Sequence, residues 1–267
     1  MTAGVLRSLL DVIPGGGGSW TGPAYGPAGK RAYGGQLAAQ SLAVAGRTVD
    51  PAKRPTSMHV QFLRGGDAGE PVDYVVDEVY DGRTAATRRV GAYQAGRLLT
   101  ATTASFAAPL PGVEHGHREL GTDPDALPRT GPPGPAPSMP SDEVDIRIAD
   151  TGAGGAFRRA LWWRVTAPLP DDPLLHACLV AFVTDIYGID PVLRVHGHSM
   201  AARTHRTATT DAAIWFHRRV HADRWNLLDA TSPAASQGRG VMTAALVGAD
   251  GTVTATLVQE GLVASRE

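Results

Sequence analysis

The sequence has little cysteine and no long apolar run. Cys178 is the single cysteine among 267 residues, so no disulfide can form within the chain. No hydrophobic stretch approaches the roughly 20 residues that a membrane-spanning helix needs. Residues 1–13 hold one basic side chain and no small-residue cleavage site after a long apolar stretch, which argues against a signal peptide. We therefore expect a cytoplasmic protein with no membrane partner.

The sequence also lacks an excess of either charge. Lys and Arg total 25 and Asp and Glu total 26, which gives a net charge of -1. This balance provides no electrostatic reason to expect a nucleic acid as a partner. Hydrophobic residues make up 43% and charged residues 19%, as is typical of a globular chain rather than a disordered one. The length suffices for one large domain or two smaller ones.

Several common catalytic and metal-binding patterns are missing. The chain contains no Gly-x-Ser-x-Gly motif, and so gives no sign of an acyl-enzyme serine hydrolase. His115-x-His117 and His196-x-His198 have no companion cysteine or acidic cluster at ligand spacing. Cys178 lies in an apolar run and is interpreted as a packing residue rather than a nucleophile. Neither a metal nor a cofactor is expected.

Prolines divide the chain into two halves. Residues 109–152 are rich in proline and glycine, and prolines this dense cannot sustain a helix or a central strand. A loop of this size would be unusual inside a compact domain. We therefore predict a linker at 109–152 between an N-terminal domain of residues 1–108 and a C-terminal domain of residues 153–267.

The two halves follow the same order of elements. In the first half, a helix is expected at 34–46 and a first strand at 57–64. In the second half, an apolar helix is expected at 174–186, and Asp171, Asp172 and Pro173 suit a helix start. Further strands joined by tight turns are expected in both halves, at 72–80, 86–94 and 98–106 and then at 213–218, 225–231, 241–247 and 252–262.

Turns and side-chain alternation predict antiparallel sheets. Ala95-Gly96 and Asp250-Gly251 precede the last strand of each half, and Asp-Gly is a strong hairpin signal. The odd positions from Val253 to Gln259 form an apolar face that ends in an amide. An antiparallel sheet with one face against a helix gives this alternation. The predicted fold is α+β, a double hotdog of two tandem helix-wrapped antiparallel sheets.

Asp185 is the first candidate for chemistry. It is the one charged residue between Pro173 and Ile189, in an otherwise apolar run. A buried carboxylate is costly unless it is hydrogen-bonded or functional. It also lies near the C-terminus of the expected helix, where the helix dipole disfavours negative charge. The alternative interpretation is a structural carboxylate bonded to the amides of the loop that follows.

Three further polar residues are weaker candidates when each is taken alone. Gln259 lies on the inward face of the last strand, as a core amide or as a functional group. Thr209 begins a strand, and strict alternation would place it on the same face as Asp211 and Trp215. Because threonine is common in strands, its presence here is weak evidence of function. His59 is interpreted as a core or pocket residue rather than a base.

Short motifs follow one another in order along nearly the whole chain outside the proline-rich segment: Tyr33-Gly34-Gly35-Gln36, His59-Val60-Gln61-Phe62-Leu63-Arg64-Gly65-Gly66-Asp67, Asp81-Gly82-Arg83, Arg88-Arg89-Val90, Thr103-Ala104-Ser105-Phe106, Thr184-Asp185, Thr209-Thr210-Asp211, Trp215-Phe216-His217-Arg218, Gly238-Arg239-Gly240 and Val258-Gln259-Glu260-Gly261. Together they resemble the bacterial acyl-CoA thioesterase II family, whose members are double hotdog proteins. The occurrence of all these motifs in the same order identifies the family far more specifically than any single motif does.

The resemblance implies a catalytic set. The family uses an Asp on the second helix, a Ser or Thr before the Trp-Phe-His strand and a Gln in the last strand, which correspond here to Asp185, Thr209 and Gln259. It implies hydrolysis of acyl-CoA to free fatty acid and CoA by a water that gives its proton to the aspartate, directly or through the threonine hydroxyl. Backbone amides around Gly35 and Gln36 would bind the oxyanion.

Several alternatives stay open at this point. His59 joins Gly35 and Gln36 as a substrate-binding candidate. The neighbouring Thr207 and Thr210 leave the choice of hydroxyl open, and the family usually has a His where this chain has Ala212. Asp185 as a direct nucleophile would form an anhydride instead.

The motifs also bear on other functions and on assembly. A hotdog hydratase or dehydratase is disfavoured, because its motif places a His where this chain has Asp190. A non-catalytic acyl-CoA binding protein would keep the pocket without needing all three polar groups. The resemblance also implies a homo-oligomer, because hotdog sheets have exposed edges and faces that a partner usually covers.

Overall fold

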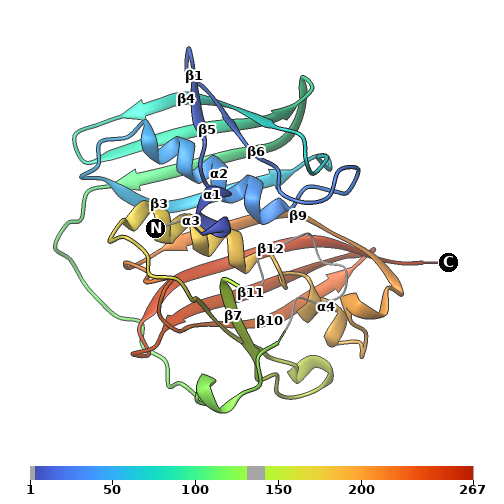
Figure 1. The fold of residues 1–267 in the computed structure, drawn as a ribbon. Coiled ribbons are helices and arrows are strands. Elements are labelled where there is room, and N and C mark those ends of the chain that lie inside the picture. The colour runs from blue at the N-terminus through green and yellow to red at the C-terminus, as the bar shows by residue number, and fades with distance from the viewer. Residues whose placement is uncertain (1–3, 131–141, 267) are drawn as a thin grey trace. The chain divides into compact units, whose positions relative to one another are not determined.

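The computed structural model describes residues 4–130 and 142–266, and these divide into two compact units (Figure 1). Unit 1 holds residues 4–114 and 170–185, and unit 2 holds residues 115–130, 142–169 and 186–266. The predicted division at 109–152 is therefore incomplete, because residues 170–185 return to the first unit. Residues 131–141 of the predicted linker lie outside the described residues.

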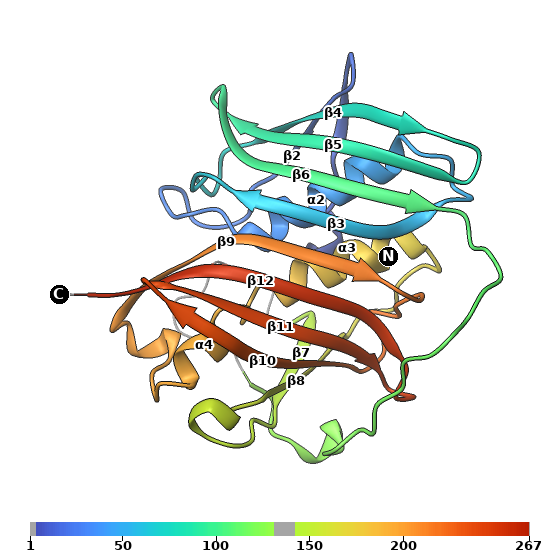
Figure 2. The same ribbon diagram turned by 180° about the vertical axis from the view of Figure 1, so that it is seen from behind.

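Unit 1 is an antiparallel sheet with helices. Its strands are ordered β1-β2-β4-β5-β6-β3, and each pairs antiparallel with its neighbour (Figures 1 and 2). The elements in chain order are α1 (Val5–Ser8), β1 (Ile13–Gly16), β2 (Ser19–Gly22), α2 (Gly34–Arg47), β3 (Arg54–Phe62), β4 (Val72–Asp81), β5 (Ala85–Gln94), β6 (Arg97–Ala107) and α3 (Pro173–Thr184).

The core of unit 1 forms between α2, α3 and one face of the sheet. On β3, Met58 and Val60 alternate with exposed residues and are each 2% exposed. Nearly every residue of α2 is buried, and glycine at position 46 leaves the space into which the Leu174 side chain of α3 packs. Because α3 is apolar on all sides, it is stable only when it is buried on several faces.

The start of α3 matches the predicted helix signal. The Asp172 side chain caps the helix by accepting a hydrogen bond from the Leu174 amide at 2.9 Å, and Pro173 occupies the first turn. The helix ends at Thr184, and Asp185 is its C-cap residue. Cys178 on this helix is 1% exposed, and burial raises the pKa of its thiol well above the usual range, as expected for a packing residue.

Unit 2 is also a six-stranded antiparallel sheet, ordered β9-β12-β11-β10-β8-β7. Its elements in chain order are η1 (Pro124–Ala126), β7 (Val144–Ile148), η2 (Gly154–Ala156), β8 (Arg159–Val165), α4 (Asp190–Arg194), η3 (Met200–Ala202), β9 (His205–Phe216), β10 (Asn226–Ser236), β11 (Arg239–Gly248) and β12 (Val253–Ser265). The linker prediction was wrong for residues 144–148, because β7 pairs with β8 at the edge of this sheet.

The predicted hairpins are confirmed, and so is the alternation from Ala255 to Gln259, whereas the buried Thr254 departs from it at a register shift. Asp250-Gly251 joins β11 to β12 with Gly251 at φ 83°, and Ala95-Gly96 joins β5 to β6 with both residues at positive φ. On β12, Ala255, Leu257 and Gln259 are all buried. Among the described residues, no helix is long and apolar enough to cross a membrane.

Candidate functional site

The Asp185 carboxylate lies against the first turn of another helix. Asp185 follows the last turn of α3, as expected, and its side chain is half-buried. A Cβ atom on Gly34, the first residue of α2, would lie 3.0 Å from Asp185 Oδ2. The N-terminus of α2 presents backbone N–H groups and the positive end of the helix dipole, and both favour a negative charge. The unfavourable dipole of α3 is therefore opposed by the favourable dipole of α2.

Two glycines allow this close approach. A Cβ atom on Gly35 would lie 2.6 Å from the Phe182 carbonyl oxygen and 2.6 Å from the Tyr33 ring, closer than real Cβ contacts come. Any larger residue at position 35 would push the first turn of α2 away from the last turn of α3. The glycine pair thus sets the distance between Asp185 and the amides of α2.

Tyr33 connects the two helix ends. Its hydroxyl donates a hydrogen bond to the Phe182 carbonyl oxygen at 2.5 Å, and the two rings meet edge to face with centroids 5.1 Å apart. The bond satisfies a carbonyl of the last turn of α3, where helices leave carbonyls without intrahelical partners. Burial first, and then the charge of Asp185, raises the pKa of the Tyr33 hydroxyl well above its usual value. The hydroxyl therefore stays a neutral donor throughout the physiological pH range.

The Gln36 side chain has a structural role. Gln36 is 1% exposed, its Oε1 accepts from the Tyr25 amide at 3.0 Å, and its Nε2 donates to the Pro23 carbonyl at 2.6 Å. These bonds attach the segment before α2 to the helix. The N-cap residue Tyr33 makes no side-chain hydrogen bond to the start of α2. Its first amides, including those of Gly35 and Gln36, are donors without intrahelical acceptors, and their role as oxyanion donors stays a prediction.

Thr209 and Gln259 meet in unit 2. Gln259 on β12 is 4% exposed, and its Nε2 donates a hydrogen bond to Thr209 Oγ1 on β9 at 2.7 Å. The bond joins a buried amide to a hydroxyl on the neighbouring strand, and sequence reasoning singled out both residues.

A β-bulge makes this contact possible. Thr209 pairs with Gly261 and Asp211 pairs with Glu260, so Thr210 is an extra residue on β9. Beyond the bulge, Ile214 pairs with Leu257 and shares the inward face of Gln259, whereas Trp215 is 45% exposed. The predicted alternation from Thr209 to Trp215 was therefore wrong. With strict alternation, Thr209 would face outward together with Trp215.

The bulge also separates the candidate hydroxyls. Thr210 Oγ1 donates to Glu260 Oε2 at 2.7 Å, and Arg239 Nη1 donates to the same carboxylate oxygen at 3.0 Å. Thr210 thus belongs to a polar cluster with Glu260 and Arg239. Of the two adjacent threonines, Thr209 is the one whose hydroxyl contacts Gln259.

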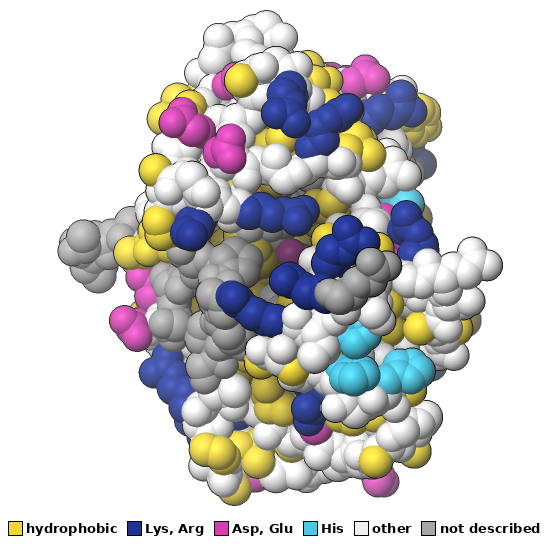
Figure 3. Space-filling view, turned by 90° about the vertical axis from the view of Figure 1, so that its right-hand side faces the viewer, with side chains coloured by type: hydrophobic (Ala, Val, Ile, Leu, Met, Phe, Trp, Pro, Cys, Tyr) yellow, Lys and Arg dark blue, Asp and Glu magenta, His cyan; other side chains and the backbone are white. Residues whose placement is uncertain are grey.

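The histidines differ in burial and in their neighbours. His59 is exposed on β3, on the opposite face from the buried Met58 and Val60, so it is not the core residue that the sequence suggested. The rings of His198 and His205 lie 4.7 Å apart, and Figure 3 shows histidine side chains gathered on one face of the molecule.

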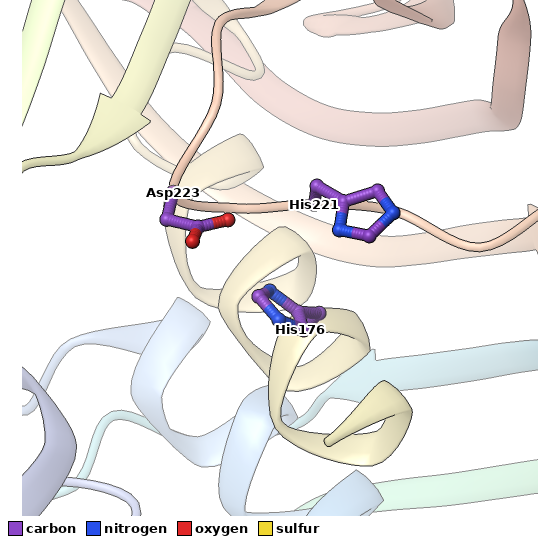
Figure 4. A group of neighbouring side chains, drawn as sticks. All are labelled: His176, His221 and Asp223. Carbon is purple, nitrogen blue, oxygen red and sulfur yellow. The ribbon is translucent and has the colours of Figure 1, made fainter. Parts of the chain in front are cut away.

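Sequence reasoning passed over three further titratable residues, which Figure 4 labels. His176 is buried within α3, at 2% exposure. His221 and Asp223 lie in the connection between β9 and β10 and are half-buried. Within unit 2 these two side chains offer one ligand atom each, fewer than the three or four protein ligands of a zinc site. No signal in the sequence marked these three residues, because they do not form a motif with the spacing of metal ligands.

Family models match both parts of the chain. Residues 21–107 match the acyl-CoA thioesterase N-terminal domain, and residues 122–263 match the acyl-CoA thioesterase C-terminal domain. Among curated proteins, acyl-CoA thioesterase 2 of Haemophilus influenzae is 29% identical over 259 residues, which cover 88% of each chain.

Solved structures give the same result. The crystal structure of an acyl-CoA thioesterase II, TesB2, from Mycobacterium marinum has a TM-score of 0.86 and 33% identity, and the match covers 98% of this chain and 99% of that one. A protein with a hot dog fold from Alicyclobacillus acidocaldarius has a TM-score of 0.78 at 18% identity and full coverage of both chains. The double hotdog prediction is confirmed.

Replacement of Tyr33 tests the connection between the helix ends. Tyr33→Phe keeps the ring but leaves the buried Phe182 carbonyl without this donor, which costs roughly 1–3 kcal/mol. We expect the free energy of unfolding in urea to fall by that amount. Tyr80→Phe is the control, because Tyr80 is 55% exposed and should change stability by less than about 0.5 kcal/mol. Equal losses in the two variants would mean that the Tyr33 bond contributes nothing specific.

Proposed function

Because the chain belongs to the acyl-CoA thioesterase family, we propose that it hydrolyses acyl-CoA to free fatty acid and CoA with a water activated by Asp185, Thr209 and Gln259. The observation that carries the assignment of residues is the hydrogen bond from the Gln259 amide to the Thr209 hydroxyl. The family resemblance implies a catalytic set with one glutamine and one Ser or Thr hydroxyl. The buried Gln259 amide bonds Thr209 rather than the adjacent Thr210, which supports Thr209 as that hydroxyl.

The reaction needs a proton acceptor and oxyanion donors. The water oxygen attacks the thioester carbonyl carbon while Asp185 takes the water proton, directly or through the Thr209 hydroxyl. The first amides of α2 offer hydrogen bonds to the oxyanion of the tetrahedral intermediate. The intermediate then collapses, the C–S bond breaks, and the proton passes from Asp185 to the departing CoA sulfur. The products are a carboxylic acid and a thiol, and Asp185 is again ionised.

Covalent connection limits the distance between the parts of this proposed site. Asp185 precedes Gly188 by three residues, and a chain of that length spans at most about 11 Å. Gly188 in turn packs against the Gln259 side chain. This restriction holds for any arrangement of the two units and supports a shared role for Asp185 and Gln259.

The position of Asp190 argues against the hydratase alternative. A hydratase would need a histidine base at this position, and Asp190 is instead buried and bonded to Arg159, with its Oδ2 2.7 Å from Nη2. The carboxylate is occupied by a structural ion pair and has no free proton-transfer role.

We expect saturable hydrolysis of at least one acyl-CoA. Thiol release should be measured over a panel of short, medium and long acyl chains, with and without a chelator. Because protein side chains supply the base and donors in this proposal, the chelator should leave the rate unchanged. The absence of thiol release with every chain length would favour a non-catalytic acyl-CoA binding protein instead.

Asp185→Asn should remove the base while it keeps the shape of the side chain. General-base catalysis contributes roughly 10²–10⁴ in rate, so kcat should fall by about that factor with little change in KM. Thr209→Ala and Gln259→Ala should each lower kcat less than Asp185→Asn does. Their effects on kcat should be less than additive when they are combined, because both residues act on one water.

Thr210→Ala is the matched control for this series, because its hydroxyl bonds Glu260 and should leave kcat nearly unchanged. Near wild-type turnover of Asp185→Asn would make Asp185 a structural carboxylate. Single-turnover hydrolysis in ¹⁸O-labelled water tests the alternative in which Asp185 attacks the thioester and forms an anhydride. Label in the Asp185 carboxylate would reveal an anhydride that water opens at the aspartyl carbonyl, whereas direct attack of water on the thioester places the label in the fatty acid alone.

We also propose that the protein is a cytoplasmic homo-oligomer. Exposed sheet edges and faces are usually covered by a partner, and closed symmetric assembly is the common solution. Trp215 on the outward face of β9 is a large apolar side chain that is 45% exposed in the single chain. Light scattering at micromolar concentration should give at least twice the chain mass of 27.9 kDa. A clean monomer at that concentration would contradict the proposal.

A further inference from the structure

The segment 188–192 packs onto β11 and β12 through three glycines. A Cβ atom on Gly188 would overlap the Gln259 amide and lie 2.6 Å from its Nε2. Ile189 fills the space over Gly261, and Val192 fills the space over Gly240. At each contact one partner is a glycine, so the segment lies closer to the strands than side chains would otherwise permit.

Space rather than backbone conformation requires glycine at position 188. Gly188 is not among the residues with positive φ, so its backbone is open to other residues. What would exclude them is the amide of Gln259, which lies where a Cβ atom would be. The Gly188 backbone therefore forms a wall against one side of this amide. Thr209 accepts a hydrogen bond from Nε2 of the same amide at 2.7 Å.

A buried ion pair fixes the segment. Asp190 Oδ2 accepts from Arg159 Nη2 at 2.7 Å, and its Oδ1 accepts from the Met200 amide at 2.8 Å. Arg159 also donates through Nε to Asp150 at 2.7 Å, and it stacks on the Tyr187 ring at 5.3 Å. Both members of the pair are less than 9% exposed. The segment is thus anchored to β8, immediately after the glycine that contacts Gln259.

We propose that the segment 188–192 is a positioning element that holds the Gln259 amide against Thr209, with Gly188 as the residue in contact. This inference rests on the proposed function, since it assigns a role to Gly188 only through Gln259. The Gly188 backbone would sterically exclude the Gln259 rotamers that turn the amide away from Thr209. A hydroxyl that accepts the Gln259 bond turns its own hydrogen away from the amide, so the wall also orients the Thr209 hydroxyl.

Gly188→Ala isolates this role because the obstructed group is the end of a flexible side chain. The added methyl should displace the Gln259 amide and break its bond to Thr209, while the backbone stays in place. A small misplacement of a catalytic group can cost roughly 10²-fold in rate. Because Gly188 itself binds no substrate in this proposal, the loss should appear in kcat and leave KM nearly unchanged.

The matched control is Gly155→Ala. A Cβ atom on Gly155 would meet nothing within 4 Å, and its φ is not positive. The control therefore reproduces the general effect of exchanging glycine for alanine on the unfolded chain. We expect kcat to fall about 10- to 100-fold for Gly188→Ala and to stay unchanged for Gly155→Ala, with KM altered less than about 3-fold in both.

The deciding experiment repeats Gly188→Ala in the Gln259→Ala background. Without the amide, the methyl has space, so the second change should lower kcat less than about 2-fold further. Full additivity would overturn the positioning role, as would an unchanged kcat of Gly188→Ala when Gln259→Ala is impaired. If Gln259→Ala itself keeps full activity, the proposed catalytic role of Gln259 fails instead.

A second variant keeps the test valid if Gly188→Ala does not fold. Ile189→Val shortens the side chain that packs over Gly261 and loosens the same segment without adding volume. It should lower kcat a few-fold with KM preserved, and this loss should disappear in the Gln259→Ala background. A loss that persists in that background would show a general destabilisation and overturn the proposal.

Discussion

The close approach of two helix ends is the constraint on which the environment of Asp185, the proposed general base, depends. The first turn of α2 reaches the last turn of α3 because Gly34 and Gly35 add no side-chain volume there. The Tyr33 hydroxyl joins the two ends by a buried hydrogen bond. A carboxylate that its own helix disfavours thereby lies beside backbone amides that favour it. The same amides are the proposed oxyanion donors, so one packing contact organises both the base and the anion-binding groups.

The second unit holds its proposed catalytic residues in place by different means. The Gln259 amide is held between a hydroxyl on the adjacent strand and the Gly188 backbone. Neither of these two neighbours is charged, so both act on the amide through space and hydrogen bonding. The ion pair of Arg159 and Asp190 contributes indirectly, because it fixes the chain next to Gly188. Stability of this buried pair and orientation of the proposed catalytic amide are thus connected.

Local patterns predicted most of the fold. The cap at Asp172, the turn at Asp250-Gly251 and the alternation that ends at Gln259 each depend on neighbouring residues, and each was visible in the sequence. The sequence did not show that α3 would pack with the first unit, because that packing depends on contacts with α2 far away in the chain. It likewise missed β7, since a short edge strand after a proline-rich stretch has little pattern of its own.

The candidate site likewise has features that local sequence predicted and features that only the folded chain shows. Asp185 was predicted because it is one charged residue in an apolar run. Its proximity to Gly34 could be seen only in the folded chain. His59 is exposed rather than part of the core, because alternation alone does not say which face of β3 is covered, and its role in substrate binding stays a prediction. The family resemblance grouped Thr209 with Gln259 in one catalytic set, whereas simple alternation placed Thr209 on the face of Trp215, which is exposed. Only the pairing register, with Thr210 as the extra residue, reconciles the two.

The bulge in β9 has a consequence for how this strand tolerates change in length. Thr209 and Thr210 face opposite sides of the sheet, one toward Gln259 and one toward Glu260. Deletion of either threonine would restore regular pairing and leave the remaining threonine opposite Gly261, on the inward face. A hydroxyl would then still face the Gln259 amide. The pair of identical residues therefore lets this strand lose one residue at the bulge without losing the inward hydroxyl.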